Sequence, residues 1–232
     1  MMNGMSSPMV LSQISANDLS LVLQASGDTA AMLMWAFPLT CCVGLPIGIL
    51  LYLLRTSLLR VHSVVYLTLG FSVNIVRSIP FILLMIALIP LTLRVMGTSL
   101  GVRGAILPLV VGAAPMYARL VEASLLELDR GIIEATLAMG ATRWQLVRWV
   151  LLPEARPGLI SAATVTAVAL VGFTAMGGAI GSGGLGDVAY REGYLRSHWV
   201  IAFIAVVGLI IVVQVLQMIG DRLAALFKRD SS

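Results

Sequence analysis

The sequence has 232 residues, of which 59% are hydrophobic and only 11% are charged. Soluble domains carry about 25% charged residues, so this composition excludes an ordinary soluble protein and indicates a membrane protein. The formal charge of +4 does not indicate nucleic-acid binding, because the basic residues are scattered between apolar runs instead of being gathered in one segment.

The first apolar run, residues 30–54, contains no charged residue. A membrane helix needs roughly 20 apolar residues, so this run is long enough to span a membrane. No Lys or Arg occurs before Arg55, so the run lacks the basic start of a cleaved signal peptide and is expected to be an integral span. Residues 1–29 are expected to form an N-terminal extension.

The second apolar run covers residues 61–93 and is interrupted by Arg77 and Pro80. At about 1.5 Å per residue, a straight helix of this length would measure about 50 Å, which exceeds a hydrocarbon core of ~30 Å. Two pieces split at residues 77–80 would each be too short to cross that core. We therefore predict one long, tilted or proline-kinked helix.

Three more runs complete the spans. The run at residues 104–118 is too short to span the membrane by itself, but it becomes long enough if the polar segments 98–103 and 119–122 lie at the membrane interfaces. The runs at residues 157–180 and 199–220 are long enough without their flanking residues. Five spans with the N-terminus outside leave ten basic residues on the inner side and four on the outer side, as the positive-inside rule requires. We therefore predict an all-α integral membrane protein with about five transmembrane helices.

The inner loop between the third and fourth spans has its own helical signals. Residues 131–139 are typical of a short helix, and Gly140 suits a left-handed stop at its end. Thr142 and Gln145 match a capping box, which predicts a second helix that runs to about residue 152. Pro153 is expected to end that helix, because it cannot donate a backbone hydrogen bond.

Several side chains of this loop are apolar although the loop lies outside the lipid. They are Ile132, Ile133, Leu137 and Met139. A protein surface must receive them, and the pattern alone leaves open whether that surface belongs to the same subunit or to a partner.

The loop resembles a known motif. Glu134, Ala135 and Thr136, then Gly140 after three residues and residues 150–153 (VLLP) after nine more, are similar to the E-A-A-x₃-G-x₉-I-x-L-P loop of ABC importer permeases. Thr136 replaces the third position, Ala, and Val150 replaces Ile. The resemblance implies the type I ABC importer permease fold, in which this loop is a coupling helix that docks on a separate ATPase.

The coupling residues that this resemblance implies are Glu134, Ala135, Thr136, Gly140, Ala141, Leu152 and Pro153. Glu134 is expected to hold the loop in place, by accepting backbone N–H bonds or by pairing with an arginine, and not to be catalytic. We expect no catalytic or metal site in this chain.

The chain is not expected to hydrolyse ATP. A nucleotide-binding P-loop requires a lysine followed by Ser or Thr, whereas the one lysine, Lys228, is followed by Arg229. ATP and Mg²⁺ are therefore expected on a partner ATPase, and this chain is expected to have no cofactor.

Four further segments narrow the resemblance to the methionine uptake family. They are residues 74–81 (NIVRSIPF), 97–101 (GTSLG), 111–115 (VGAAP) and 175–179 (AMGGA). The resemblance implies a permease for methionine in a bacterial inner membrane. The distribution of basic residues described above gives it an extracytoplasmic N-terminus and a cytoplasmic C-terminus. The resemblance also implies a homodimer, two copies of the ATPase and a methionine-binding lipoprotein outside.

The domain boundaries follow from these segments. Residues 30–221 are expected to form the permease domain, with the coupling loop at about 128–153, and residues 222–232 to form a cytoplasmic tail. Residues 1–29 would then be an extracytoplasmic extension. Membrane lipid is an expected partner and nucleic acid is not.

Candidate residues for the translocation path lie in two spans. Met176 and Phe173 are expected to close a pore near its outer half, with ordinary helix packing as the alternative. Arg77 is costly in an apolar run unless paired or hydrated, and Asn74 is one turn away and close enough to orient it. A snorkelling interfacial arginine is the alternative for Arg77.

A glycine-rich stretch, residues 177–186, follows these gate candidates. It contains a G-x-G-x-x-G pattern, which we reject as a nucleotide site because it follows a membrane helix and not a strand. It is expected to be a turn where helices approach closely or a binding protein docks.

Two alternative functions remain open at this point. The loop motif would suit a permease for another small solute, such as a polar amino acid or an aliphatic sulfonate. A secondary transporter without an ATPase is disfavoured, because it should show inverted repeats or several charges within the membrane, whereas this sequence shows one such arginine.

Overall fold

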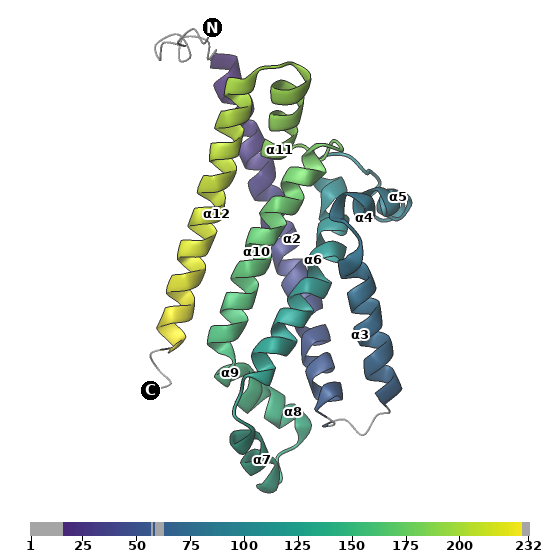
Figure 1. Ribbon diagram of the computed structural model, residues 1–232, viewed down its shortest axis with the longest axis vertical. Helices are drawn as coiled ribbons and strands as arrows, with labels where there is room; N and C mark the ends of the chain where they lie inside the picture. The colour runs from purple at the N-terminus through teal and green to yellow at the C-terminus, as the bar shows by residue number, and fades with distance from the viewer. Residues whose placement is uncertain (1–15, 57, 59–62, 229–232) are drawn as a thin grey trace, which may run out of the picture. The chain divides into compact units, whose positions relative to one another are not determined.

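The computed structural model describes residues 16–56, 58 and 63–228, and the regular elements in this part of the chain are all helices (Figure 1). Four of them are long: α2 (Ala16–Arg55), α6 (Gly101–Leu126), α10 (Arg156–Gly178) and α12 (Trp199–Lys228). The others are α3 (Ser63–Ser78), α4 (Phe81–Ala87), α5 (Ile89–Met96), α7 (Arg130–Ala138), α8 (Arg143–Leu146), α9 (Leu152–Glu154), α11 (Gly184–Val188) and the π-helices η1 (Val147–Leu151) and η2 (Ala189–Leu195). The predicted all-α class is confirmed.

The helices divide into two compact units. The first unit holds the described residues of Met1–Ala36 together with Phe81–Leu109 and Leu170–Gln214. The second unit holds the described residues of Phe37–Pro80, Val110–Ala169 and Val215–Ser232. The predicted coupling loop therefore lies wholly in the second unit, and the predicted gate residues Phe173 and Met176 lie in the first.

The described helices include four that are long and apolar enough to cross a membrane, namely α2, α6, α10 and α12. The bent pair α3 and α4 adds a fifth span if it is counted as one. The predicted number of about five spans is thus confirmed, and each span begins or ends close to charged residues, as at Arg55 and Arg156.

The first helix is longer than its apolar run. It begins at Ala16, so the described residues 16–29 of the predicted extension are the first turns of α2. Asp18 lies in the first turn, where its charge is favourable beside the free N–H groups. An apolar run marks the part of a helix that contacts lipid, and it carries no signal for helical turns that continue beyond it.

The predicted single helix over residues 61–93 is wrong. The chain breaks after Ser78 and resumes as α4 at Phe81, and a second break separates α4 from α5. Pro80 explains the first break, because its ring disfavours a helical conformation at Ile79 and it has no N–H to donate. Residues 61 and 62 of this prediction lie outside the described residues.

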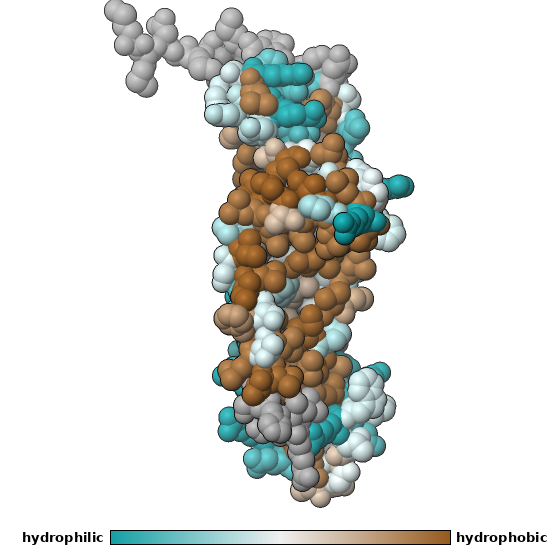
Figure 2. All heavy atoms as spheres, turned by 90° about the vertical axis from the view of Figure 1, so that its right-hand side faces the viewer, coloured by the Kyte–Doolittle hydropathy of each residue, from teal (hydrophilic) through white to brown (hydrophobic). Residues whose placement is uncertain are grey.

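Large apolar side chains lie on the surface of both units. Phe203 in the first unit and Phe71 in the second are largely exposed. Figure 2 shows that strongly hydrophobic residues cover most of one face of the molecule. Such a surface is too apolar for water, which agrees with helices that contact lipid tails.

In the first unit, α11 packs closely on its neighbours. A Cβ atom added at Gly186 would collide with the backbone of Ala175 in α10. The backbone N–H of Leu185 donates a hydrogen bond of 2.9 Å to Oγ1 of Thr29 in α2. The expected close approach of helices in the glycine-rich stretch is therefore observed.

In the second unit, two glycines let α2 approach α6. A Cβ atom at Gly48 would lie 2.6 Å from the carbonyl oxygen of Ala118, and one at Gly44 would lie 2.8 Å from that of Ala114. Small residues at this spacing allow helix backbones to come close in a membrane, where van der Waals contact is the main source of association.

A buried carboxylate joins three helices of the second unit. Glu122 of α6 accepts a hydrogen bond of 2.7 Å from Arg119, one turn earlier, and one of 3.3 Å from the hydroxyl of Tyr66 in α3. Arg55, in the last turn of α2, lies 3.6 Å from the same carboxylate. The Glu122 side chain is only 3% exposed, so these partners replace the water that its charge has lost.

Arg119 carries the contacts of this cluster across to α3. Its Nη2 atom donates to the carbonyl oxygen of Gly70 at 2.9 Å and to Oδ1 of Asn74 at 3.1 Å. A Cβ atom at Gly70 would lie 3.0 Å from that Nη2 atom, so a glycine leaves room for the guanidinium. The helix α3 is therefore attached to α6 by charge-assisted hydrogen bonds as well as by apolar packing.

We predict that Glu122→Gln destabilises the protein, because it leaves the mostly buried Arg119 without its counter-charge. Loss of one partner of a buried ion pair costs about 3 kcal/mol or more, and a change of this size lowers the melting temperature by roughly 6–12 °C. Thermal unfolding in detergent measures this shift. The matched control is Glu127→Gln, at an exposed carboxylate, and equal melting temperatures for the two variants would contradict the prediction.

Candidate functional site

The predicted coupling loop begins with α7. Asp129 caps this helix, and its carboxylate accepts a hydrogen bond of 2.8 Å from the backbone N–H of Gly131. The helix ends at Ala138, as predicted from residues 131–139 to within one residue. Ile133 of α7 is buried in an apolar cluster with Tyr52 of α2 and Leu125 of α6, so the loop is anchored on the spans of its own unit.

The turn after α7 is fixed by backbone geometry. Gly140 has a φ angle of +85°, in the left-handed region that favours glycine, which confirms its predicted role as a helix stop. The N–H of Gly140 donates to the carbonyl of Leu137 at 3.0 Å, and that of Ala141 donates to the carbonyl of Thr136 at 3.3 Å. This pair of bonds is a Schellman motif, and it satisfies two carbonyl groups at the helix end.

The second helix of the loop starts with the predicted capping box. The backbone N–H of Gln145 donates to Oγ1 of Thr142 at 3.3 Å, and the N–H of Thr142 donates to Oε1 of Gln145 at 2.7 Å. The backbone groups of the turn are therefore hydrogen-bonded both at the end of α7 and at the start of α8.

Pro153 does not end the second helix, contrary to the prediction. The chain passes from α8 through η1 into α9, which ends at Glu154. In η1 the hydrogen bonds span five residues, and the N–H of Leu152 donates to the carbonyl of Val147. The wider π-helical turn places Pro153 in the first turn of α9, where a missing N–H group is tolerated.

The apolar side chains of the loop separate into two sets. Leu146, Val147 and Leu151 are buried in the same cluster as Ile133. Met139, Trp144 and Trp149 are not part of this cluster and are 81%, 73% and 72% exposed. Both surfaces considered from the sequence are thus present, because one face of the loop rests on its own unit and the other is uncovered.

The uncovered face is hollowed. A groove of about 350 Å³ lies beside the Gly140 turn. Its lining, which we call the loop groove, consists of Thr136, Met139, Gly140, Ala141, Gln145, Trp149 and Val150. Three of the predicted coupling residues, Thr136, Gly140 and Ala141, border this groove, whereas Ala135, Leu152 and Pro153 do not line it.

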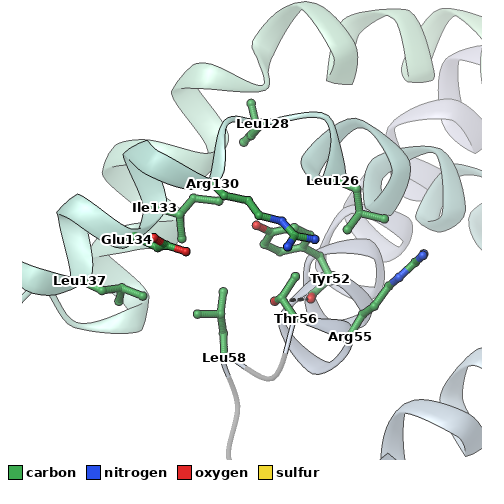
Figure 3. Close-up of a pocket in the computed structure, with 10 residues that line it drawn as sticks. All are labelled: Tyr52, Arg55, Thr56, Leu58, Leu126, Leu128, Arg130, Ile133, Glu134 and Leu137. Atoms are coloured by element: carbon green, nitrogen blue, oxygen red, sulfur yellow. Dashed lines mark hydrogen bonds between the residues drawn. The ribbon is translucent and has the colours of Figure 1, made fainter.

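Glu134 lies on the opposite face of α7 from the loop groove. Figure 3 shows its carboxylate pointing into a pocket between α7 and the end of α2. Arg130, Ile133 and Leu137 line the same pocket from α7. Together with Glu134 they occupy the i, i+3, i+4 and i+7 positions that share one helix face. Glu134 makes no hydrogen bond or ion pair with a described residue, so the described structure supplies no bond by which it holds the loop.

The predicted gate residues lie near the end of α10. The ring of Phe173 stacks on Phe81 of α4, with centroids 4.3 Å apart and ring planes 5° from parallel. Met176, nearly one turn later, is 50% exposed. The structure thus holds Phe173 against another span segment of the same unit and leaves Met176 free to contact something else.

Asn74 and Arg77 are not brought together as predicted. The amide oxygen of Asn74 accepts from Arg119, and Arg77 is exposed without a hydrogen bond or ion pair to a described residue. From the sequence, residues 119–122 were assigned to a membrane interface, and Arg119 and Glu122 were not identified as an ion pair. The two residues have opposite charges and lie three positions apart in one helix, and this spacing could have indicated the ion pair.

Comparison with known proteins places the chain among transport proteins. Residues 44–231 match the family model for binding-protein-dependent transport system inner membrane components. The chain is 43% identical to the probable D-methionine transport system permease protein MetI of Vibrio cholerae, over 92% of this chain and 95% of that protein. It is 48% identical to the methionine import system permease protein MetP of Bacillus subtilis, over 74% of this chain and 78% of that protein.

The fold is shared with solved transporters. A chain of the MetNI methionine ABC transporter in an inward-facing conformation matches with a TM-score of 0.90 and 45% identity, over 92% of this chain and 99% of that chain. A chain of an amino acid ABC transporter matches with a TM-score of 0.66 at 17% identity, which shows the fold alone. The ABC importer permease fold that the loop motif predicted is confirmed, and the chain belongs to the family of binding-protein-dependent transport system inner membrane components.

Proposed function

We propose that the chain is the membrane-spanning permease subunit of an ATP-driven importer and that it forms the translocation path for methionine, in its L or D form or as a derivative. The observation that carries this proposal is the likeness to methionine permeases over nearly the whole chain, helices and loop together. A likeness confined to the loop would not distinguish methionine from a polar amino acid or an aliphatic sulfonate.

Energy for transport comes from a partner in this proposal. The similar MetNI protein is an ABC transporter, and this chain lacks the lysine-containing loop that would hold a nucleotide. A separate ATPase therefore binds ATP and Mg²⁺. Two copies of it associate with a homodimer of this chain, because about five spans from one subunit enclose a path poorly and a two-fold axis doubles them.

The loop groove and the exposed side chains beside it are the proposed contact with the ATPase. Met139, Trp144 and Trp149 are apolar, exposed and outside the predicted spans, which is the composition of an interface core. The opposite face of α7 is packed through Ile133 on α2 and α6. When the ATPase subunits close, the α7–α8 pair transmits their movement to those two spans.

The proposed orientation follows from charge. In this proposal the segments that carry most basic residues, namely residues 55–60, the coupling loop and the C-terminal tail, lie in the cytoplasm. The N-terminus is then outside and the C-terminus inside a bacterial inner membrane. The glycine-rich turn before α11 then faces outward, where a methionine-binding lipoprotein delivers the solute.

Met176 is the proposed gate. Its exposed side chain lies beside Phe173, which the stack on Phe81 holds in one position. Two symmetry-related Met176 side chains would meet across a dimer axis and close the path with flexible apolar groups. Arg77 and Asn74 are less favoured as path residues, since Asn74 is engaged with Arg119.

We predict that proteoliposomes containing this chain, its ATPase and its binding protein accumulate radiolabelled methionine when ATP is present on the ATPase side. An excess of unlabelled methionine should abolish the signal, whereas glutamine or taurine should leave it unchanged. Uptake of methionine without ATPase, or equal competition by taurine, would contradict the proposal.

We predict that Met139→Glu reduces the amount of ATPase that co-purifies with the permease by about tenfold or more, because a buried unpaired charge costs several kcal/mol in an apolar interface. The stoichiometry of the purified complex measures this. Ala225→Glu is the control, at an exposed position near the end of α12. Unchanged ATPase binding by Met139→Glu in a folded permease would exclude this face as the docking site.

We predict that Met176→Ala opens a leak, seen as faster loss of preloaded methionine from proteoliposomes without ATP. The effect is expected to be a few-fold, since the truncation removes most of the side chain that closes the path. Met34→Ala is the control, because Met34 is also exposed and lies in the same unit. If leak, basal ATPase activity and coupling all match the unaltered protein, Met176 is not a gate.

A further inference from the structure

A small cavity lies in the first unit, where α5, the turn after it and the start of α6 meet. We call it the α5–α6 cavity, and it is lined by residues of α4, α5, that turn and α6 and by Ile180. Its volume is about 30 Å³. A water molecule needs at least about 10–15 Å³ of such space, whereas small-ligand sites measure about 300–1,000 Å³. The cavity therefore has the size for water and not for a solute.

The hydroxyl of Thr92 is a polar group in need of a partner. Thr92 lines the cavity from α5 and is only 1% exposed, and its Oγ1 atom has no hydrogen-bond partner among the described residues. Other buried threonines of this chain donate to a backbone carbonyl one turn earlier, as Thr166 does to Ala162 at 2.8 Å. A buried hydroxyl that has lost water without gaining a new hydrogen bond is costly, so we expect a partner at this position.

A second polar group of the cavity lacks its usual donor. In an α-helix, the carbonyl of Gly104 accepts a hydrogen bond from the N–H group of residue 108, but residue 108 is a proline and has no N–H group. Gly104 and Pro108 both line the cavity, and both are buried. In membrane helices, carbonyl groups freed by a proline are satisfied by neighbouring side chains or by ordered water.

Ser99 adds a second hydroxyl to the lining, from the turn between α5 and α6. The turn lies close against α6, because a Cβ atom added at Gly104 would collide with the backbone of Ser99. The other residues of the lining are apolar, and no charged side chain is among them. A metal cation is therefore disfavoured, since Mg²⁺ and Ca²⁺ sites in proteins use carboxylates.

We propose that the α5–α6 cavity binds one ordered water molecule. The water donates a hydrogen bond to the carbonyl of Gly104 and forms a second with the hydroxyl of Thr92, and the hydroxyl of Ser99 is its third partner. Buried waters in proteins make two to four such bonds. The bound water connects α5, the last piece of the broken segment that follows α3, to the span α6. The proposal is independent of the identity of the transported solute.

A high-resolution cryo-EM map of the full transporter tests the proposal. We expect a density peak at about 2.7–3.2 Å from both Oγ1 of Thr92 and the carbonyl oxygen of Gly104. A map without a peak between these two atoms would overturn the proposal. A peak at about 2.0–2.5 Å from several oxygen atoms would also overturn it, because such distances belong to a bound cation.

Two variants at Thr92 separate the hydroxyl from the space around it. Thr92→Val removes the hydroxyl at nearly the same side-chain volume, so the peak should be lost. Thr92→Ser keeps the hydroxyl, so the peak should remain. A peak that is unchanged in Thr92→Val would contradict the assigned hydrogen bonds.

Thermal unfolding of the permease in detergent gives an independent measurement. Thr92→Val should lower the melting temperature by about 2–4 °C, because the Gly104 carbonyl then loses its water. Thr40→Val is the matched control, since the Thr40 hydroxyl is also buried without a described partner but does not line this cavity. The control should not lower the melting temperature. An unchanged or higher melting temperature for Thr92→Val, or an equal fall in both variants, would overturn the proposal.

Discussion

The apolar cluster beneath α7 is the contact on which the arrangement of the second unit depends. Ile133 from the loop and Leu151 from η1 meet Tyr52 of α2 and Leu125 of α6 in this cluster, and all four are buried. Within one subunit, a loop outside the lipid finds a hydrophobic environment only where the ends of the spans supply it. Burial of these side chains therefore fixes where α7 lies, and with it the two surfaces on either side of α7.

The two surfaces of α7 have different physical characters. The loop groove is bordered by exposed Met139 and Trp149, and its shape is maintained by a turn whose hydrogen bonds are satisfied at both helix ends. The pocket on the other face of α7 is lined by the charged side chains of Arg55, Arg130 and Glu134. An exposed apolar surface suits a protein partner, which agrees with the proposed contact with the ATPase, whereas the pocket on the other face is charged.

The buried carboxylate of Glu122 connects the spans of the second unit by polar bonds. Inside a membrane, a lone charge is costly, and here three hydrogen-bonding or ionic partners from α2, α3 and α6 surround it. The cluster adjoins the apolar contact under α7, since Val121 and Leu125 of the same helix are part of that contact. In the proposed coupling, movement of α7 is passed to helices that polar bonds hold in a defined register.

The sequence by itself determined the elements whose signals are local. The spans follow from apolar length, and the Gly140 stop and the Thr142 capping box follow from backbone geometry that neighbouring residues impose. Only the tertiary structure decided which side chains meet. Asn74 was expected to orient Arg77 on its own helix, but it bonds Arg119 of α6, and Glu134 proved to face a pocket built by another helix. Those contacts join residues far apart in the chain, and no local pattern specifies them.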